Sequence, residues 1–522
     1  MALLTSLLGA LVSLPGNADR SVSHAYTDTA DTTLGRFVQD DLARHPGLSG
    51  FHILASGLDA FAARALLAQS AERSIDAQYY LLHNDLVGRL FLDMLLNAAD
   101  RGVRVRLLVD DMTLGDTRDT GMAALDSHDN VDIRVFNPFT RRSWRWLQIL
   151  TRFDDVTRRM HNKSFTVDNQ FTVVGGRNIG NEYFEADPEL EFGDLDALAI
   201  GPVVREVSNS FDSYWNSESS YPISSLLDQP KSRENLQRFR ASLSRFVAQQ
   251  HDSDYLRALR DSALAVRIRA DRSSLVERIT SKRFNIAWGK ARVLFDDPAK
   301  VSTGREQTAG HLFTQFQPLM MSIENELTVF SPYFVPGRQG MKRLRELRRR
   351  GVRVRILTNS LASTDVAAVH AGYARYRPGL LRAGVELYEI DDVLSRAQRR
   401  QKKGPSASSK ASLHAKSFVI DAERVFIGSM NLDPRSVVEN TEIGLLIESP
   451  AVAAAMSAWF DREASDIAYR VELERNEAGK EVLAWYRDLA DKRERLTTEP
   501  NTGFWRRFGV GLLQLLPIES LL

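Results

Sequence analysis

Two hydrophobic patterns alternate through the first part of the chain. Over residues 58–74 and 88–102, apolar side chains recur with helical spacing, which predicts two amphipathic helices. Residues 75–82 and 103–111 are short runs rich in Ile, Val, Leu and Tyr, and they predict buried strands. A strand, a helix and a second strand in this order form a β-α-β unit, whose natural place is a parallel sheet.

The second part of the chain repeats this plan. Residues 326–334 predict a strand, 341–351 a helix and 352–360 the matching strand. The sequence Arg-Gly-Val-Arg-Val-Arg begins at Arg101 in the first part and again at Arg350. We therefore expect a duplicated α/β domain, with a site at the seam between the two halves.

A spaced motif also occurs once in each part. It reads His-x-Lys, four residues, Asp, six residues and then Gly-[Gly/Ser]-x-Asn. The first copy consists of His161, Lys163, Asp168 and Gly175-Gly176-Arg177-Asn178, and the second of His414, Lys416, Asp421 and Gly428-Ser429-Met430-Asn431. Two copies with unchanged spacing argue against chance.

Each motif copy starts in a stretch of alternating apolar and polar residues, at 161–168 and at 414–421, which predicts a strand. Residues two apart on a strand share a face, so the His and Lys of each copy are expected to project together. Both aspartates stand where turn-forming residues begin, and a structural role at the turn is the expectation from this pattern. A returning strand then brings the Asn of each copy back toward its own His and Lys.

The side chains of the motif suit chemistry on a phosphodiester. An ammonium and amide donors stabilise phosphate oxygens, and an imidazole attacks phosphorus or transfers a proton. If the two copies face each other, one His attacks a shared phosphate and the other protonates the departing alkoxide. These roles need opposite protonation states, so the two His are expected to titrate as a coupled pair. A lone His on a strand is commonly a satisfied structural residue, but the duplication argues against that reading here.

Composition narrows the class of protein without identifying it. The chain has 522 residues, of which 43% are hydrophobic and 26% charged, and this fits a globular protein with two domains of about 200 residues each. A formal net charge of +1 excludes a globally basic protein that coats nucleic acid. The absence of cysteine excludes disulfides, thiol nucleophiles and thiolate metal sites.

The duplicated motif resembles the HKD signature of the phospholipase D superfamily. Residues 160–184, 192–204 and 330–337 resemble its bacterial cardiolipin synthase branch, and within that branch the C-type synthases. The resemblance implies an α/β fold of two tandem phospholipase D-like α-β-α domains, related by a pseudo-twofold axis and sharing one active site at their interface. The expected segments are an apolar membrane-associating segment and linker at 1–34, a first domain at 35–230, a helical connector at 231–285, a second domain at 286–470, and a C-terminal helix with an amphipathic tail at 471–522.

The resemblance also assigns roles to residues. The catalytic motif residues that it implies are His161, Lys163, Asp168, His414, Lys416 and Asp421. Asn178 and Asn431 join the two lysines in binding phosphate. Asp194 and Glu442 follow the two motifs as carboxylates that orient the histidines; Asp196 is the alternative in the first half, where the frame set by Gly-Pro favours Asp194. Neither a metal nor another cofactor is expected, because Lys and Asn stabilise the charge that a cation would otherwise neutralise.

The activity that this resemblance implies is cardiolipin synthesis. A phosphatidyl group would pass from phosphatidylethanolamine or phosphatidylglycerol to phosphatidylglycerol through a phosphohistidine on His161, with His414 as acid and base. A phospholipase D that uses water as the acceptor is the alternative, and a nuclease of the superfamily is a less favoured one. The expected partners are these phospholipids and a membrane surface, without nucleic acid, while an accessory protein or a homo-oligomer stays open. The expected location is the bacterial inner (cell) membrane, peripheral or monotopic.

Three segments favour a membrane surface. Residues 1–14 form an apolar run that is shorter than the about 20 residues of a spanning helix, and an interfacial anchor, a degenerate signal or a buried helix all stay open for it. Aromatic and Arg residues interleave at 136–153 and again at 504–516, where a helix packed on the core is the alternative. The basic stretch at 396–410 predicts a loop beside the second motif that either attracts anionic lipid or is simply solvated.

Overall fold

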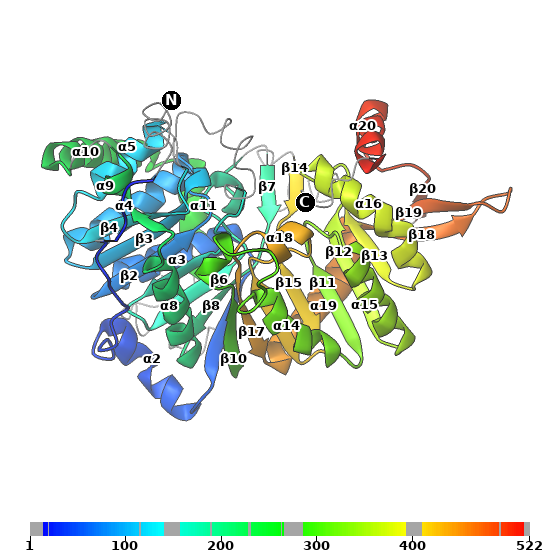
Figure 1. The fold of residues 1–522 in the computed structure, drawn as a ribbon, viewed down its shortest axis with the longest axis horizontal. Helices are drawn as coiled ribbons and strands as arrows, with labels where there is room; N and C mark the ends of the chain where they lie inside the picture. Colours follow the sequence, from blue (N-terminus) through cyan, green and yellow to red (C-terminus); the bar gives the residue numbers. More distant parts are fainter. Residues whose placement is uncertain are drawn as a thin grey trace, which may run out of the picture.

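The computed structural model describes residues 14–18, 20–113, 116–139, 157–187, 190–227, 231–262, 264–265, 286–392, 410–489 and 492–515. Of the segments expected at the membrane, residues 1–13 and 140–153 lie outside these ranges, as do residues 396–409 of the basic stretch, whereas residues 504–515 are described. The described residues form one continuous mixed sheet of 18 strands with helices on both faces, and a separate two-stranded sheet (Figure 1).

The first half of the chain contributes eight strands to the long sheet. In chain order they are β1 (Ser49–Leu54), β2 (Ser74–Tyr79), β3 (Arg104–Asp110), β4 (Val131–Phe136), β5 (Ser164–Val167), β6 (Phe171–Gly175), β8 (Asp196–Ile200) and β9 (Ser220–Pro222). Their pairing gives the order β9-β4-β3-β2-β5-β6-β8-β1 across the sheet. The pair of β2 with β3 is parallel, which confirms the predicted β-α-β unit.

The second half contributes the other ten strands. They are β10 (Ala287–Phe295), β11 (Glu326–Phe330), β12 (Arg353–Asn359), β13 (Glu386–Ile390), β15 (Ser417–Ile420), β16 (Arg424–Gly428), β17 (Ile443–Glu448), β18 (Ala468–Arg475), β19 (Glu481–Leu489) and β20 (Lys492–Leu496). Their order is β10-β17-β16-β15-β11-β12-β13-β18-β19-β20. Read outward from the seam, the first seven strands repeat the order of the first half, so the predicted duplication is confirmed.

The two halves join where β1 pairs antiparallel with β10. Gly50 lies opposite Trp288 and Ser49 opposite Gly289. A Cβ atom on Gly289 would lie 2.3 Å from the backbone oxygen of Glu448, so the close crossing of strands at this point requires glycine. A shared hydrophobic cluster lies across this seam and contains Phe51, Val174 and Ala199 from the first half and Val293, Ile427 and Leu445 from the second.

Helices cover both faces of each half. Those of the first half and the connector are α2 (Thr33–Arg44), α3 (Gly57–Ser70), α4 (Leu86–Asp100), α5 (Asp116–Leu125), α8 (Pro202–Trp215), α9 (Ile223–Leu226), α10 (Arg233–Gln250) and α11 (Asp254–Arg260). Those that follow are α14 (Leu312–Met321), α15 (Gly337–Arg349), α16 (Ala367–Arg382), α18 (Pro434–Val438), α19 (Pro450–Ile467) and α20 (Phe504–Leu515). Short 3₁₀ turns lie at Asp111–Thr113, Asn181–Tyr183 and Pro298–Val301. Among the described residues, none of these helices is both long and apolar enough to span a bilayer.

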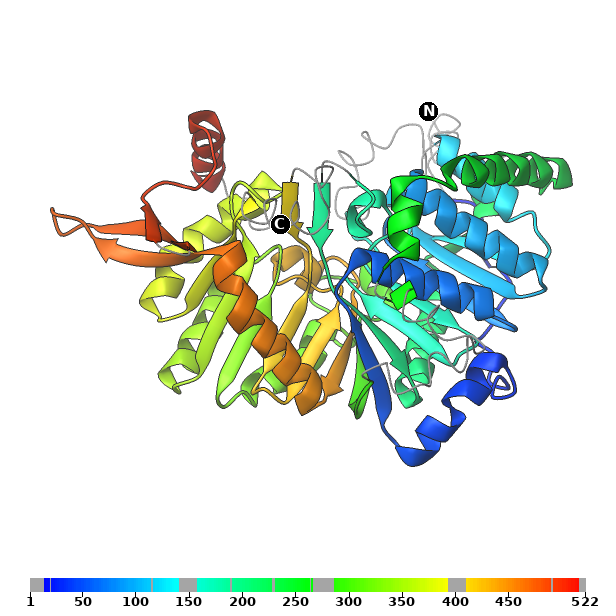
Figure 2. The ribbon, with the colours of Figure 1, turned by 180° about the vertical axis from the view of Figure 1, so that it is seen from behind.

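The helices also show how the halves are related. α8, which follows β8, lies on the near face in Figure 1, whereas α19, which follows the equivalent β17, lies on the near face in Figure 2, seen from behind. Equivalent helices therefore cover opposite faces of the sheet. This exchange is what a pseudo-twofold axis in the plane of the sheet produces, and it brings the equivalent ends of both halves to one edge.

The hydrophobic patterns predicted the elements of the two β-α-β units, but they did not predict the strands close to the C-terminus. The predicted helices at 58–74, 88–102 and 341–351 correspond to α3, α4 and α15, although α3 ends before the predicted boundary because β2 begins at Ser74. For residues 471–522 the prediction was a helix with an amphipathic tail. The structure has α20 there, but strands extend the sheet as far as Leu496, and the boundary expected at residue 470 falls within β18.

Candidate active site

Each motif begins just before a strand and is held in place by the other half of the molecule. The prediction that His161 and Lys163 lie within a strand is wrong, because β5 begins at Ser164. Instead, the backbone N–H of His161 donates to the carbonyl oxygen of Thr441 at 2.9 Å, across the seam. The contact resembles a strand pair, but its partner comes from the second half.

The second motif is anchored in the reverse sense. The two-stranded sheet pairs β7 (Leu190–Gly193) of the first half with β14 (Lys410–Leu413) of the second, in parallel. The backbone N–H of His414 donates to the carbonyl oxygen of Gly193 at 2.7 Å. Figure 1 shows this pair above the seam. Both histidines thus stand at the junction of the halves.

A carboxylate from the opposite half holds each imidazole. Nδ1 of His161 lies 2.9 Å from Oε2 of Glu442, and Nδ1 of His414 lies 2.5 Å from Oδ2 of Asp194. All four side chains are buried. Because Nδ1 is used in both rings, Nε2 is the nitrogen left for chemistry on a substrate. The neighbouring candidate Asp196 instead pairs with Arg64 at 3.0 Å, so Asp194 is the residue that meets a histidine.

Electrostatics place the two motifs in one site. Burial lowers the pKa of His161 well below its usual value, and the charges of Lys163, Lys416 and His414 lower it further. Burial likewise lowers the pKa of His414, with Lys416 as the next cause. Charged groups shift each other's pKa values in this way only when they lie close together. The expected coupling of the two imidazoles therefore has a structural basis.

The lysines are buried beside the histidines. Each ammonium donates to the backbone oxygen of the histidine two residues earlier. Burial lowers the pKa of Lys163 well below its usual value and that of Lys416 to about 8. An anion bound in the site stabilises the charged form of both lysines, because its negative charge offsets their loss of hydration.

The two carboxyl groups differ in charge. Burial raises the pKa of Glu442 to about 7. Burial acts on Asp194 in the same direction, but His414 and Lys416 outweigh it and hold the pKa of Asp194 below its ordinary value. At neutral pH, therefore, Asp194 is ionised while Glu442 titrates.

The chain is similar to known proteins along most of its length. A family model described as "Cardiolipin synthase, PLD-like domain" matches residues 65–215 and 318–464. The chain belongs to this cardiolipin synthase family. Cardiolipin synthase C of Escherichia coli (strain K12) is 43% identical to it over 484 residues, which are 92% of this chain and 98% of that protein. Cardiolipin synthase A of Pseudomonas syringae pv. syringae (strain B728a) is 25% identical over 397 residues, 76% of this chain and 64% of that one.

A solved structure shows the same fold at low sequence identity. The crystal structure of phosphatidylserine synthase from Haemophilus influenzae Rd KW20 aligns with 94% of this chain and 100% of that chain, with a TM-score of 0.56 and 13% identity. The family model and the relative from Escherichia coli confirm the predicted membership of the phospholipase D superfamily, and the solved structure agrees with the predicted two-repeat α/β fold.

The motif aspartates of this cardiolipin synthase family member lie away from the histidines. Asp168 and Asp421 follow β5 and β15, a whole strand beyond the His-x-Lys segments, with φ of 50° and 54°. Asp168 accepts backbone N–H bonds from Glu72, Arg73 and Ser74, and Asp421 accepts them from Glu324, Asn325 and Glu326. The turn interpretation fits this geometry, whereas a catalytic role, which the resemblance implied, does not.

The motif asparagines are placed differently in the two halves of the family fold. Nδ2 of Asn178 donates to the hydroxyl of Tyr183 at 2.9 Å, and Oδ1 accepts from the backbone of Leu81 at 3.2 Å. Asn431 is also buried, and its Oδ1 has no hydrogen-bond partner within the described residues. Asn178 is therefore hydrogen-bonded to Tyr183, and the ring of Tyr183 packs edge-on against His414 at 5.1 Å.

Sequence reasoning missed several residues around the histidines. The ring of Tyr80 lies 5.1 Å from that of His161, and Phe192 stacks on His414 at 5.0 Å. Ser429 donates its hydroxyl to Glu442. Tyr80 directly follows β2 at the edge where sites of parallel sheets form, and Ser429 is the variable position of the motif, so both carried a signal that could have been used.

One group of side chains could be considered for a metal ion. In the described part of the chain, His83, Asp85 and Glu182 offer ligand atoms within 4.8 Å of one another. Asp85 already accepts backbone N–H bonds from Gly88 at 2.9 Å and Asn181 at 2.8 Å, and His83 pairs with Glu182 at 3.2 Å. These partners account for the cluster as a helix cap and an ion pair.

Proposed function

We propose that this protein is a cardiolipin synthase that transfers a phosphatidyl group to phosphatidylglycerol, with phosphatidylethanolamine or phosphatidylglycerol as donor. The observation that carries the proposal is the pair of buried imidazoles, each fixed at Nδ1 by a carboxylate of the opposite half and both set among two lysines. The resemblance to cardiolipin synthase C of Escherichia coli along 92% of the chain supports the choice of acceptor.

In the first step, Nε2 of His161 attacks the phosphorus of the donor. The phosphorus–oxygen bond to the headgroup breaks, and Nε2 of His414 gives its proton to the departing alkoxide, which leaves a phosphohistidine. The division of roles follows from charge. Burial lowers the pKa of His161, and this ring faces a carboxyl that titrates near neutral pH, so His161 is the neutral nucleophile. His414 faces an ionised Asp194, so it takes the proton when the anionic substrate raises both imidazole pKa values.

In the second step, Nε2 of His414 removes the proton from a glycerol hydroxyl of phosphatidylglycerol. The oxygen attacks phosphorus, the phosphorus–nitrogen bond breaks, and His161 leaves as a neutral ring. Lys163 and Lys416 stabilise the charge on the phosphoryl oxygens in both steps. Tyr80, Tyr183 and Phe192 limit the access of water to the rings, which favours an alcohol acceptor over hydrolysis.

The test is reconstitution with defined lipids. Purified protein is added to vesicles of phosphatidylglycerol, with and without phosphatidylethanolamine, and the products are measured by mass spectrometry. We expect cardiolipin, and none with His161→Ala. Phosphatidic acid without cardiolipin would indicate a phospholipase D, and folded protein that makes neither product would refute the proposal.

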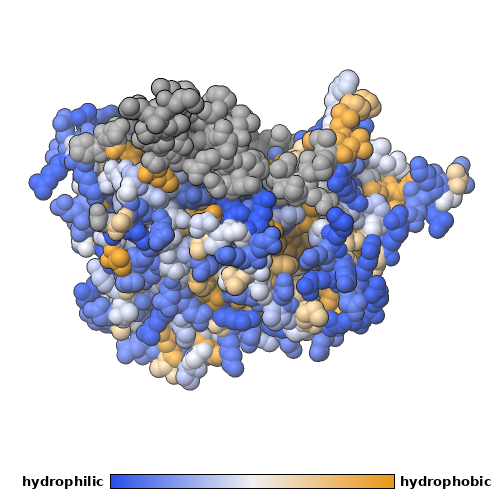
Figure 3. Space-filling view, viewed as in Figure 1, coloured by the Kyte–Doolittle hydropathy of each residue, from blue (hydrophilic) through white to orange (hydrophobic). Residues whose placement is uncertain are grey.

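We further propose that the protein lies on the surface of the bacterial inner membrane and touches it through α20. Among the described residues, α20 carries more exposed large apolar side chains than any other element: Phe504 64%, Trp505 78%, Phe508 50%, Leu512 51% and Leu515 79%. Figure 3 shows α20 as an apolar projection above the body of the molecule. Exposed aromatic rings beside Arg506 and Arg507 suit the headgroup layer.

Vesicle binding tests this orientation. Replacing Trp505 and Phe508 by Glu is expected to reduce sedimentation with phosphatidylglycerol vesicles at least tenfold. A control pair of substitutions at Glu477 and Lys480, which are exposed between β18 and β19, should leave it unchanged. Equal binding of both variants would contradict the proposed contact.

A further inference from the structure

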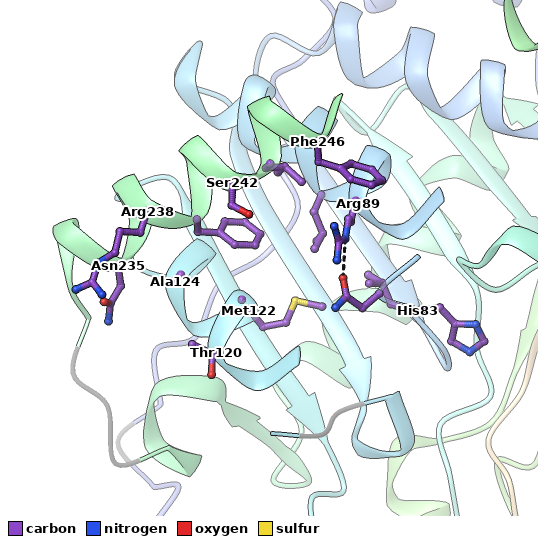
Figure 4. Close-up of a pocket in the computed structure, with 15 residues that line it drawn as sticks. His83, Arg89, Thr120, Met122, Ala124, Asn235, Arg238, Ser242 and Phe246 are labelled. Carbon is purple, nitrogen blue, oxygen red and sulfur yellow. Dashed lines mark hydrogen bonds between the residues drawn. The ribbon is translucent and has the colours of Figure 1, made fainter. Parts of the chain in front are cut away.

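A groove of about 380 Å³ lies between α4, α5 and α10 at the outer end of the first half (Figure 4). α10 belongs to the segment that connects the two halves, and it packs against both α4 and α5. The side chains that form its walls include Leu92, Met122, Phe239, Ser242, Leu243 and Phe246. The groove is within the size range of sites for small ligands.

The groove is apolar along its walls and basic at its rim. Gly121 faces Phe239 so closely that a Cβ atom would lie 3.2 Å from the ring, so glycine keeps this part of the groove open. The guanidinium of Arg89 lies 4.6 Å from the ring centre of Phe246 and donates to Oδ1 of Asn84 at 3.0 Å (Figure 4). An alkyl chain that ends in an anionic group would match this arrangement.

At the equivalent place in the described part of the second half, the structure has a basic hollow instead. The hollow between α15 and α16 is lined by Arg345, Arg348, Arg349 and Arg382 together with Gly379 and Ala383. Three of the apolar wall residues, Phe239, Leu243 and Phe246, come from α10, which lies outside the repeated plan. The duplicated fold by itself therefore does not explain an apolar groove at this place.

The inner end of the groove reaches the catalytic edge of the sheet. Leu82 and His83 line it, and the backbone N–H of His83 donates to the carbonyl oxygen of Ile179 at 2.8 Å. Ile179 directly follows Asn178 of the motif. The side chain of Asn178 donates to the hydroxyl of Tyr183, whose ring lies 5.1 Å from that of His414. A ligand could therefore extend from the histidines past His83 into the groove.

We propose that this groove holds one acyl chain of a substrate phospholipid while the phosphodiester of that lipid lies at the histidines. The proposal rests on the proposed function and names the part of the substrate that the first half recognises. Each buried methylene increases affinity about fourfold. The enzyme should therefore prefer long-chain over short-chain phosphatidylglycerol even when both are presented in mixed micelles at the same surface fraction.

The test fills the groove from its exposed side. Ser242→Trp places a large ring on the α10 face that lines the groove, and Ser244→Trp places the same ring on an exposed part of α10 outside it. We expect Ser242→Trp to raise KM for a long-chain lipid about tenfold and to leave turnover of a six-carbon lipid within twofold. Ser244→Trp should behave as wild type. If Ser242→Trp does not fold, the smaller Ser242→Phe takes its place.

A labelling experiment locates the bound acyl chain directly. Phosphatidylglycerol with a diazirine near the end of one acyl chain is irradiated with wild-type protein, and the labelled peptides are identified by mass spectrometry. We expect label on residues 239–246, and its loss in Ser242→Trp. Unchanged chain-length dependence in Ser242→Trp, or label only elsewhere, would overturn the groove proposal. Absence of cardiolipin from wild type with either lipid would instead refute the proposed function.

Discussion

The two halves of the molecule build the same arrangement with different chemistry. In one corner of the site His161 faces Glu442, which also accepts a bond from Ser429. In the other corner His414 faces the shorter Asp194, and Gly176 occupies the position equivalent to Ser429. A Cβ atom on Gly176 would lie 2.1 Å from Oδ1 of Asp194, so this carboxylate fits only because the serine is replaced by glycine. Small exchanges at matched positions thus give two histidines different proton affinities.

Removing either histidine should reduce activity more than any other change. The two variants should differ in which step of the reaction they still carry out. We expect His161→Ala and His414→Ala each to reduce cardiolipin synthesis about 10⁴-fold or more. A phosphatidyl ester of p-nitrophenol needs no proton on its leaving group. His414→Ala should still release a burst of p-nitrophenol from this ester and accumulate phosphohistidine, whereas His161→Ala should not. A burst from His161→Ala and none from His414→Ala would reverse the roles.

Replacing the ionised Asp194 should reduce turnover more than replacing Glu442. Asp194→Asn removes the charge that supports the imidazolium of His414, and we expect turnover to fall about 10²- to 10³-fold. Glu442→Gln replaces a carboxyl whose pKa is about 7 and should cost about tenfold. Steady-state kinetics of both variants at pH 7 test this order. Equal losses would show that the two corners are electrostatically equivalent.

The serine and the glycine of the motif should not be exchangeable. Gly176→Ala forces the Asp194 carboxylate away from His414, and we expect about a hundredfold loss of turnover. Ser429→Ala removes one hydrogen bond to Glu442 and should cost less than tenfold. Thermal unfolding of both variants provides the control for folding. Full activity of Gly176→Ala would mean that the carboxylate can move without consequence.

The motif aspartates should affect stability and leave chemistry nearly unchanged. Asp168→Ala removes the acceptor of three backbone N–H groups in a buried turn, and we expect a loss of about 3 kcal/mol in unfolding free energy. Asp421→Ala should cost less, about 1–2 kcal/mol, because its turn is less buried. Asn at either position keeps one acceptor and the left-handed conformation, and should recover about half. A hundredfold fall in kcat at unchanged stability would restore a catalytic role.

A further effect concerns the pH dependence of stability. Glu442 has an ordinary pKa of 4.5 when unfolded and about 7 in the folded protein. Between these values the folded state binds more protons than the unfolded state, so stability falls as the pH rises through this window. Glu442→Gln should lose this dependence, by on the order of 2 kcal/mol between pH 5 and pH 8. Melting temperatures at both pH values, with the exposed Glu477→Gln as control, test it. A parallel shift of both variants would contradict the raised pKa.

The sequence predicted the parts of the site that depend on local pattern. The spacing of the two motifs and the β-α-β units depend on neighbouring residues, and the structure confirms the duplicated fold. The pairing of Glu442 with His161 and of Asp194 with His414 could not be obtained in this way, because it depends on contacts between residues far apart in the chain. The same limit explains the misplaced strand. The alternation at 161–168 is real, but its first residues pair with the other half and not with the sheet.

The crossed carboxylates have a consequence for the history of the chain. If two identical copies of one half once assembled around a twofold axis, both histidines would necessarily have faced the same acid and had equal basicity. Fusion into one polypeptide removed that constraint, since a change from serine to glycine or from Glu to Asp could then occur on one side alone. In a single chain the two rings can face different acids and therefore need not have equal basicity.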